Sequence, residues 1–183
     1  DINKIPIKTL RENIGYVPQD NFLFSNTINK NIAFSDPKNM SQKEIIQAAK
    51  NAQVYDNIIE FPDKFESLLG ERGSNVSGGQ KQRISIARAL IKNTKILILD
   101  DSLSAVDTQT EERILKSLEE IMKDRTSILI SHRISTIKDA DKIFVLDEGE
   151  LIEKGTHESL LQNGKLYYEL YQKQQLEEKI ANS

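Results

Sequence analysis

Two consecutive carboxylates follow an apolar run in the middle of the chain. Residues 96–99 are all apolar, as in a strand buried on both faces of a parallel sheet, and Asp100 and Asp101 come directly after them. In open α/β sheets, ligands bind at the carboxyl ends of the strands. One acid there can hold Mg²⁺, and the other can orient or deprotonate a water molecule. The alternative is that an aspartate only caps the turn that follows the strand.

A second candidate is the sequence SGGQKQR at residues 77–83. Ser77 and Gln80 have the spacing of a capping box, in which both side chains satisfy amides at the start of a helix. Gly78 and Gly79 are unfavourable inside a helix, by roughly 1 kcal/mol each relative to alanine. They leave backbone amides uncovered at the positive end of the helix, where phosphate binds well. The segment therefore predicts either a capped helix start or an anion contact made by Ser77 and these amides.

The two histidines have different contexts. His132 comes after Thr126–Ile130, a segment that ends in three apolar residues and predicts the next strand, so we expect it at the same sheet edge as Asp100. A single histidine after a strand can equally be structural or exposed. His157 is expected at the start of a helix. Four basic residues predict a solvated helix face: Lys81, Arg83, Arg88 and Lys92.

Helical and strand patterns alternate from residue 77 onward. Apolar positions three and four apart predict helices, and short apolar runs predict strands. We expect helices at 78–92, from Thr108, and at 134–138, 156–163 and 165–179, with strands at 14–17, 95–99, 126–130, 142–146 and 150–153. Ser41 and Glu44 form a capping box that opens an amphipathic helix, and residues 54–69 add a shorter one. The fold class is α/β with a mainly parallel sheet and a helical insertion at roughly 41–75.

The composition excludes several classes of protein. The 183 residues carry a net charge of −3, and 38% of them are hydrophobic and 29% charged, which suits a globular domain and gives no preference for nucleic acid. There is no cysteine, so disulfide scaffolds, cysteine metal sites and thiol nucleophiles are excluded. The longest apolar runs span four residues, which predicts no transmembrane helix. Neither G-x-x-x-x-G-K-[ST] nor G-x-G-x-x-G occurs.

Taken together, these segments resemble the nucleotide-binding domain of ATP-binding cassette (ABC) transporters along nearly the whole chain. Five segments match the family's motifs in order: Gln19 as the Q-loop glutamine, VSGGQKQR at 76–83 as the signature, residues 96–100 as Walker B, SAVD at 104–107 as the D-loop and His132 as the switch histidine. Val76 replaces the usual leucine. Residues 70–73 and the apolar residues 22–24 are similar to segments of exporters; the latter also fit either local core or an interface.

The resemblance implies a P-loop NTPase-like fold in which two cassettes close head to tail around two ATP molecules. The residues expected to bind nucleotide are Gln19, Ser77, Gly78, Gly79, Gln80 and Asp107, the signature acting on ATP held by the partner domain. Asp100 and Gln19 would contact Mg²⁺, Asp101 and His132 would be catalytic, and Gln19 would also sense the transmembrane domain. The implied partners are a second nucleotide-binding domain, in a homodimer or heterodimer, and a transmembrane domain, at the cytoplasmic face of the membrane and without nucleic acid.

Two departures from the family pattern matter. The sequence contains neither the Walker A loop nor the stacking aromatic that precede the Q-loop in the family. It begins at Asp1, with no initiator Met and no signal-peptide pattern. We therefore expect that the N-terminal part of the domain lies before Asp1 and that the chain alone is inactive. Asp101 stands where the family's catalytic glutamate is usual and is shorter by roughly 1.5 Å. It resembles the degenerate site of heterodimeric exporters, although His132 retains the family residue.

The sequence thus predicts the C-terminal portion of the ATP-binding and ATP-hydrolysing domain of an ABC exporter. The alternatives are a non-catalytic cassette or regulatory module, and a soluble cassette ATPase acting on DNA or translation. The expected division of the chain is 1–40 for the Q-loop part of the core, 41–92 for the helical subdomain with the signature, 93–165 for Walker B, D-loop and switch, and 166–183 for a C-terminal helix.

Overall fold

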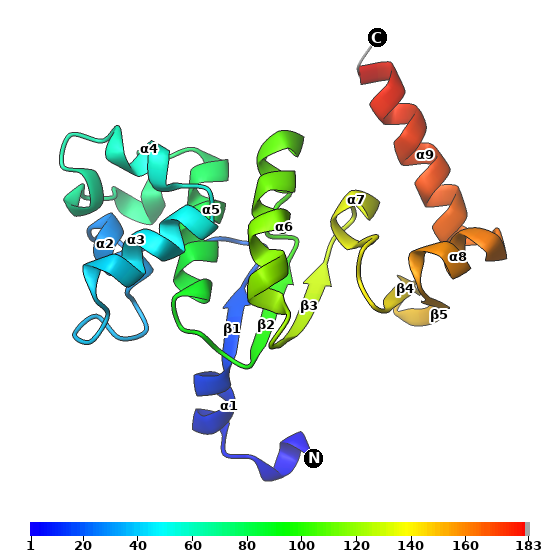
Figure 1. Cartoon of the computed structure of the whole chain (residues 1–183), viewed down its shortest axis with the longest axis horizontal. Coiled ribbons are helices and arrows are strands. Elements are labelled where there is room, and N and C mark those ends of the chain that lie inside the picture. The colour runs from blue at the N-terminus through cyan, green and yellow to red at the C-terminus, as the bar shows by residue number, and fades with distance from the viewer. Residues whose placement is uncertain (182–183) are drawn as a thin grey trace. The chain divides into compact units, whose positions relative to one another are not determined.

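The structure, a computed structural model, describes residues 1–181. The chain forms two compact units, Asp1–Ile130 and Ser131–Ser183, which are described separately below. Figure 1 shows the order of their helices and strands. Within residues 1–181, no helix has both the length and the apolar character needed to cross a membrane.

The first unit contains a three-stranded parallel sheet. Its strands are β1 (Ile14–Val17), β2 (Ile96–Asp100) and β3 (Thr126–Ile130), in the order β1-β2-β3 (Figure 1). β2 is the central strand, and Leu97 and Leu99 are buried. The parallel sheet predicted from strands that are apolar at successive positions is confirmed, since both pairs run parallel.

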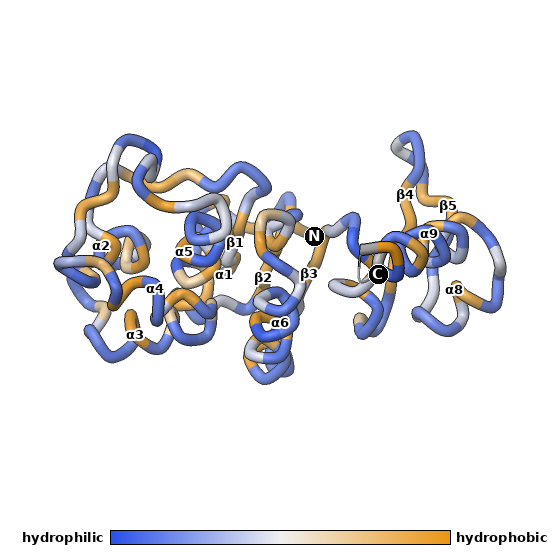
Figure 2. Tube along the Cα trace, turned by 90° about the horizontal axis from the view of Figure 1, so that it is seen from above, coloured by the Kyte–Doolittle hydropathy of each residue, from blue (hydrophilic) through white to orange (hydrophobic). Residues whose placement is uncertain are grey.

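Two long helices contribute apolar side chains to the core of this unit. α5 (Gly78–Leu90) precedes β2, and α6 (Thr108–Met122) connects β2 to β3. The hydrophobic stretches visible along the strands in Figure 2 pack with Ile84 and Ile86 of α5 and with Ile114 and Leu118 of α6. α6 therefore has one face toward the core and one toward solvent, whereas α5 is enclosed along most of its length.

A helical region packs on α5, and it begins at Ile28, earlier than the insertion predicted at roughly 41–75. It contains α2 (Ile28–Ile32), α3 (Gln42–Asn51) and α4 (Tyr55–Ile59), with the 3₁₀ turns η2 (Lys64–Glu66) and η3 (Glu71–Gly73). The predicted capping box at α3 is confirmed: Ser41 N donates to Glu44 Oε2 at 2.8 Å, and Glu44 N donates to Ser41 Oγ at 3.3 Å.

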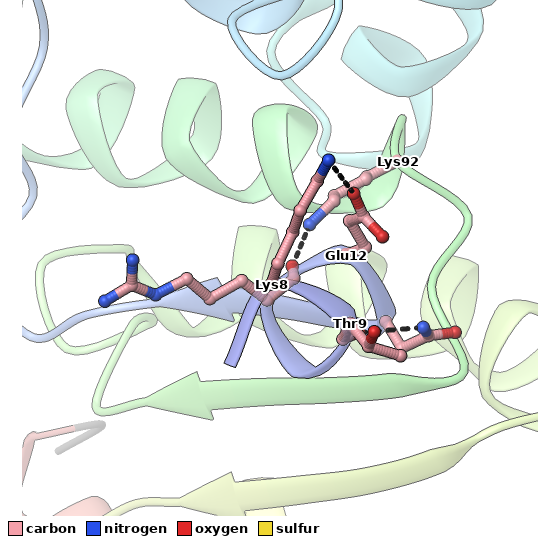
Figure 3. A network of polar contacts seen from close by, with 6 residues as sticks. Lys8, Thr9, Glu12 and Lys92 are labelled. Atoms are coloured by element: carbon pink, nitrogen blue, oxygen red, sulfur yellow. Dashed lines mark hydrogen bonds and ion pairs between the residues drawn. The ribbon is translucent and has the colours of Figure 1, made fainter. Parts of the chain in front are cut away.

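The N-terminal segment is helical, which the sequence pattern does not predict. After the 3₁₀ turn η1 (Ile2–Lys4), α1 (Ile7–Asn13) leads directly into β1. Lys92, just beyond α5, donates from its ammonium group to the carbonyl oxygen of Arg11 (Figure 3). It also donates to the carbonyl oxygen of Ile14 at 3.3 Å. Lys92 thus holds the end of α1 against the end of α5.

The second unit is a hairpin covered by helices. It contains α7 (Ile134–Ile137), β4 (Ile143–Asp147), β5 (Glu150–Gly155), α8 (His157–Asn163) and α9 (Leu166–Ala181). β4 and β5 are antiparallel, and Glu148 and Gly149 at the predicted turn have φ angles of 46° and 82°. His157 opens α8, as expected. Tyr167 of α9 is buried in this unit's own small core.

Candidate functional site

The start of α5 is both capped and open to solvent. Ser77 N donates to Gln80 Oε1 at 2.9 Å and Gln80 N donates to Ser77 Oγ at 3.2 Å, so the capping box is confirmed. The amides of Gly78 and Gly79 take no part in these two bonds, and the first turn of a helix offers them no acceptor. The hydroxyl hydrogen of Ser77 is not used by these two bonds either. Ser77 and Gly78 are exposed. The two interpretations of this segment are therefore compatible: the box shapes the helix start and leaves donors for an anion.

The two glycines differ in what surrounds them. A methyl group at Gly79 would lie 2.9 Å from the carbonyl oxygen of Ala105, closer than real contacts allow. A methyl group at Gly78 would only touch the Ala105 side chain at 3.7 Å, an ordinary van der Waals distance. Packing within this chain therefore explains glycine at position 79 and does not explain it at position 78.

Gln82 joins α5 to the segment that follows β2. It is only 5% exposed, donates from Nε2 to Ser104 Oγ at 3.2 Å and accepts at Oε1 from the Ala105 amide at 3.0 Å. Sequence reasoning did not select Gln82. A polar residue at an inward-facing position of an amphipathic helix was the available signal, because buried amides need partners.

The carboxylate of Asp100 at the end of β2 accepts a hydrogen bond from the neighbouring strand. Tyr16 of β1 donates its hydroxyl to Asp100 Oδ2 at 3.0 Å. This bond is the main cause of a raised pKa at Tyr16, with smaller contributions from desolvation and from the negative charge of Asp100. The contact of Tyr16 with Asp100 was not predicted from the sequence, because only the parallel pairing of β1 with β2 brings the two residues together.

Asp101 has a left-handed backbone conformation, with φ of 43°. Aspartate tolerates this region better than most residues. Its amide donates to the Ile130 carbonyl at 2.8 Å, which continues the pairing of β2 with β3. Gln19 Nε2 donates to Asp101 Oδ2 at 3.4 Å. The structure thus brings the predicted residues Gln19, Asp100 and Asp101 together at the carboxyl end of the sheet.

Asp107 is the N-cap residue of α6. Its Oδ1 accepts from the Thr110 amide at 2.9 Å, and this bond, followed by smaller effects including the positive charge of Arg83, lowers the pKa of the carboxyl group. The prediction that the helix opens at Thr108 is confirmed. The side chain of Asp107 is exposed beside this helix start.

His132 belongs to the second unit, between β3 and α7, and its side chain is exposed. Its carbonyl oxygen accepts a hydrogen bond of 2.7 Å from Gln174 Nε2 of α9. Sequence reasoning did not select Gln174, which lies 42 residues further along the chain.

The prediction of a solvated basic face on α5 is wrong. Arg83 donates to the carbonyl oxygens of Gly79 and Gln53, and burial lowers its pKa. Arg88 is more deeply enclosed, and desolvation lowers its pKa to about 10. Both guanidinium groups thus hold neighbouring backbone segments in place.

Arg88 supports an exposed group of aromatic rings. It donates to Asn31 O at 2.7 Å, to Asn31 Oδ1 at 2.8 Å and to Phe22 O at 2.9 Å. Its guanidinium also lies 5.5 Å from the ring centre of Phe24 and 5.7 Å from that of Phe34. Phe22, Phe24 and Phe34 are 48%, 37% and 52% exposed, whereas Leu23 between the first two is buried. The apolar segment 22–24 therefore supplies both core and surface.

The donor set around Asp100 suits a hard cation shared with a phosphate group. Among residues 1–181, no group of three or more histidine, aspartate or glutamate side chains could hold a metal by itself. Magnesium ordinarily uses one or two carboxylates together with substrate phosphates and water. Asp100 offers a carboxylate, and Gln19, which bonds to the neighbouring Asp101, offers an amide oxygen. These residues fit Mg²⁺ brought with a nucleotide.

A parallel α/β sheet with acids at its carboxyl edge, beside a helix that begins with two glycines, fits the class of P-loop NTPase-like domains. A family model described as "ABC transporter" matches residues 1–104. A protein of Bacillus subtilis (strain 168), "Uncharacterized ABC transporter ATP-binding protein YknU", is 50% identical over 181 residues, covering 99% of this chain and 31% of that protein. The "ATP-dependent lipid A-core flippase" of Syntrophus aciditrophicus (strain SB) is 46% identical over 181 residues, covering 99% of this chain and 30% of the flippase.

A solved structure described as "Structure of a bacterial Atm1-family ABC exporter with ATP bound" superposes with a TM-score of 0.91 at 45% identity, over 95% of this chain and 30% of that one. The chain belongs to the ABC transporter family. It spans about 30% of the length of these relatives.

Proposed function

We propose that this chain is part of the ATP-binding and ATP-hydrolysing domain of an ABC exporter, at the cytoplasmic face of a membrane. The observation that carries the proposal is the contrast between Gly79, which packing requires, and Gly78, which it does not. An exposed glycine in the first turn, beside unused amides, is suited to the close approach of a phosphate group. The related exporter with bound ATP supports the same assignment.

In this proposal the signature acts on ATP held by a partner domain. Ser77, Gly78 and Gly79 would donate to its γ-phosphate, while Gln80 holds the amide of Ser77. Asp107 of the D-loop would also take part in nucleotide binding. Gln82 connects these two segments through Ser104 and Ala105, so the signature and the D-loop would move as one body.

The acids at the end of β2 would serve the chain's own nucleotide. Asp100 and Gln19 would hold Mg²⁺, which when bound neutralises charge on the phosphates and positions them. Asp101 would accept a proton from the attacking water, and His132 would contact the γ-phosphate and help to order that water. For the 183-residue chain alone we expect no ATP hydrolysis, because it contains no G-x-x-x-x-G-K-[ST] loop.

The signature assignment is tested in the complete protein that contains this chain, in membranes. Gly78→Asp places a carboxylate where the phosphate would lie, and Ser77→Arg fills the same space. We expect both to abolish ATPase activity. Gln109→Asp is the matched control, because it places the same charge in the exposed first turn of α6. Full activity in Gly78→Asp and Ser77→Arg would refute the assignment.

A second candidate is a degenerate cassette whose own nucleotide site does not hydrolyse ATP, and Asp101 favours it. The side chain is shorter than glutamate by roughly 1.5 Å, and a displacement of about 1 Å can cost about 100-fold in rate. Asp101→Asn distinguishes the two functions. Little change in turnover of the assembled transporter supports the degenerate site, whereas a large loss identifies Asp101 as a working base.

The aromatic group of Phe22, Phe24 and Phe34 is the proposed contact with the transmembrane domain. These exposed rings, two of which contact the Arg88 guanidinium, form an apolar surface suited to a partner. Phe34→Ser should therefore lower transport per ATP hydrolysed without abolishing hydrolysis. Unchanged coupling in this variant would assign the rings to packing alone.

A further inference from the structure

Gln174 of α9 bonds to the backbone on both sides of Arg133. Its Nε2 donates to the carbonyl oxygen of His132 at 2.7 Å, and its Oε1 accepts from the amide of Ile134 at 2.9 Å. An amide oxygen can only accept and an amide nitrogen can only donate. One orientation of the side chain therefore satisfies both bonds, and the two ends of Gln174 are not interchangeable.

Several side chains form hydrogen bonds with the backbone around His132. The amide of Arg133 donates to Ser131 Oγ at 3.0 Å, and Ser131 Oγ lies 3.3 Å from Thr136 Oγ1. Gln174 adds the two contacts that fix the carbonyl of His132 and the amide of Ile134. Together they restrict the backbone torsions between these atoms, which set the direction in which the exposed imidazole leaves the chain.

A purely structural role predicts a different use of the same side chain. Ile134 is the first residue of α7, whose N-cap position makes no side-chain capping bond of its own. Gln174 Oε1 could serve only to cap this one-turn helix and to join α7 to α9. That role requires the acceptor but not the donor, whereas holding the carbonyl of His132 requires the donor.

We propose that Gln174 is a positioning residue for His132: α9 holds the backbone of the histidine segment and thereby fixes the direction in which the imidazole leaves the chain. The inference rests on the proposed role of His132 in ATP hydrolysis. It gives the C-terminal helix a part in the reaction, because displacement of α9 would release the backbone that orients His132.

The test is a double-mutant cycle in the complete protein in membranes, with kcat and KM for ATP measured for each variant. Gln174→Leu should lower kcat by about 10- to 100-fold, the scale expected when a reacting group is misplaced by up to about 1 Å, with KM nearly unchanged. In a His132→Ala background the same change should cost nothing further, because residues that act as a unit are not additive. Gln172→Leu, at an exposed position of the same helix, is the matched control.

Gln174→Glu separates positioning from capping and guards against misfolding in Gln174→Leu. It keeps an acceptor for the Ile134 amide but replaces the donor by an oxygen that repels the carbonyl of His132. We expect it to lower kcat as Gln174→Leu does, with the Ile134 amide still protected from hydrogen exchange. Wild-type kcat in Gln174→Glu would overturn the inference and leave capping as the role.

Two further outcomes separate the inference from the proposed function. If His132→Ala lowers kcat but Gln174→Leu lowers it equally in the presence and absence of His132, only the inference fails, and Gln174 is structural. If His132→Ala leaves kcat unchanged, the proposed role of His132 fails and the inference fails with it.

Discussion

Replacing Gly79 by alanine places a methyl carbon 2.9 Å from the carbonyl oxygen of Ala105. Ordinary contact begins at 3.4 Å, so the backbone after Walker B must retreat by about 0.5 Å or α5 must shift. Either movement strains hydrogen bonds, because Gln82 of α5 bonds to both Ser104 and Ala105.

The expected change in stability follows from two opposing effects. Alanine in a helix gains up to about 1 kcal/mol over glycine, while overpacking a close contact costs about 1–3 kcal/mol. We therefore expect Gly79→Ala to lower the free energy of unfolding by about 1–2 kcal/mol. Gly78→Ala meets only a 3.7 Å contact and should be neutral or stabilise by about 0.4–1 kcal/mol.

ATPase activity should not follow stability in these two variants. Gly78→Ala introduces a methyl group on the exposed side, where the partner's γ-phosphate would approach, and should lower kcat/KM by about 10- to 100-fold. A stable Gly78→Ala with lowered activity, beside a destabilised Gly79→Ala, is the pattern expected if one glycine serves binding and the other serves packing.

Stability is measured by urea unfolding of the purified protein with pulse proteolysis as the readout. At an m-value of about 2 kcal/mol/M, the midpoint of Gly79→Ala should fall by about 0.5–1 M. ATPase activity is measured on the same preparations. Equal midpoint shifts in the two variants, or full activity in a folded Gly78→Ala, would refute the reasoning.

Three further predictions concern side chains that the tertiary structure brings together. Arg88→Lys removes the planar group that bonds Asn31 and Phe22, and should cost about 2–3 kcal/mol of stability, because a single ammonium cannot satisfy the same acceptors. Tyr16→Phe removes the donor to Asp100 and should raise the Mg²⁺ concentration for half-maximal ATPase activity by about 10-fold. Burial raises the pKa of Tyr167 to about 12 from 10.0 in the unfolded chain. The contribution of this group to the free energy of unfolding is therefore complete below pH 10 and is lost as the pH rises from 10 to 12. Tyr167→Phe should reduce the accompanying fall in the urea midpoint.

Each of these predictions has a matched control. Arg72→Lys, at an exposed position, should leave the urea midpoint unchanged, and an equally small shift in Arg88→Lys would contradict the first prediction. Tyr168→Phe is the control for Tyr16→Phe and Tyr167→Phe, because it also removes a phenol hydroxyl group. An unchanged Mg²⁺ requirement in Tyr16→Phe, or an alkaline slope in Tyr167→Phe equal to that of the unchanged protein, would show that these hydroxyl groups are not coupled as described.

Much of the fold could be predicted because it depends on neighbours in sequence. The apolar run before Asp100 predicts a parallel strand, and β2 lies between two parallel neighbours. The capping boxes at Ser41 and Ser77 join residues three positions apart, and both are present. By contrast, α1 has no buried residue, so its pattern carries no signal, and it is held instead by Lys92.

The basic face of α5 shows why one prediction failed. A charged residue on a helix is usually solvated, yet Arg88 bonds to Asn31 and Phe22, which precede it by 57 and 66 residues. The sequence shows the charge, but the carbonyl oxygens that enclose it are supplied by a distant segment. Burial of a long side chain depends on such partners and not on the local pattern.

The sequence by itself determined the motifs, their order, the helix starts and the acid-tipped strand, because each of these depends on residues a few positions apart. Only the tertiary structure decided which glycine is required by packing, that Tyr16 bonds to Asp100 from 84 residues away, and that Gln174 holds the segment of His132. These contacts arise where separate segments meet, and hydrogen bonds and steric contacts act over only a few ångströms, so no pattern along the chain encodes them.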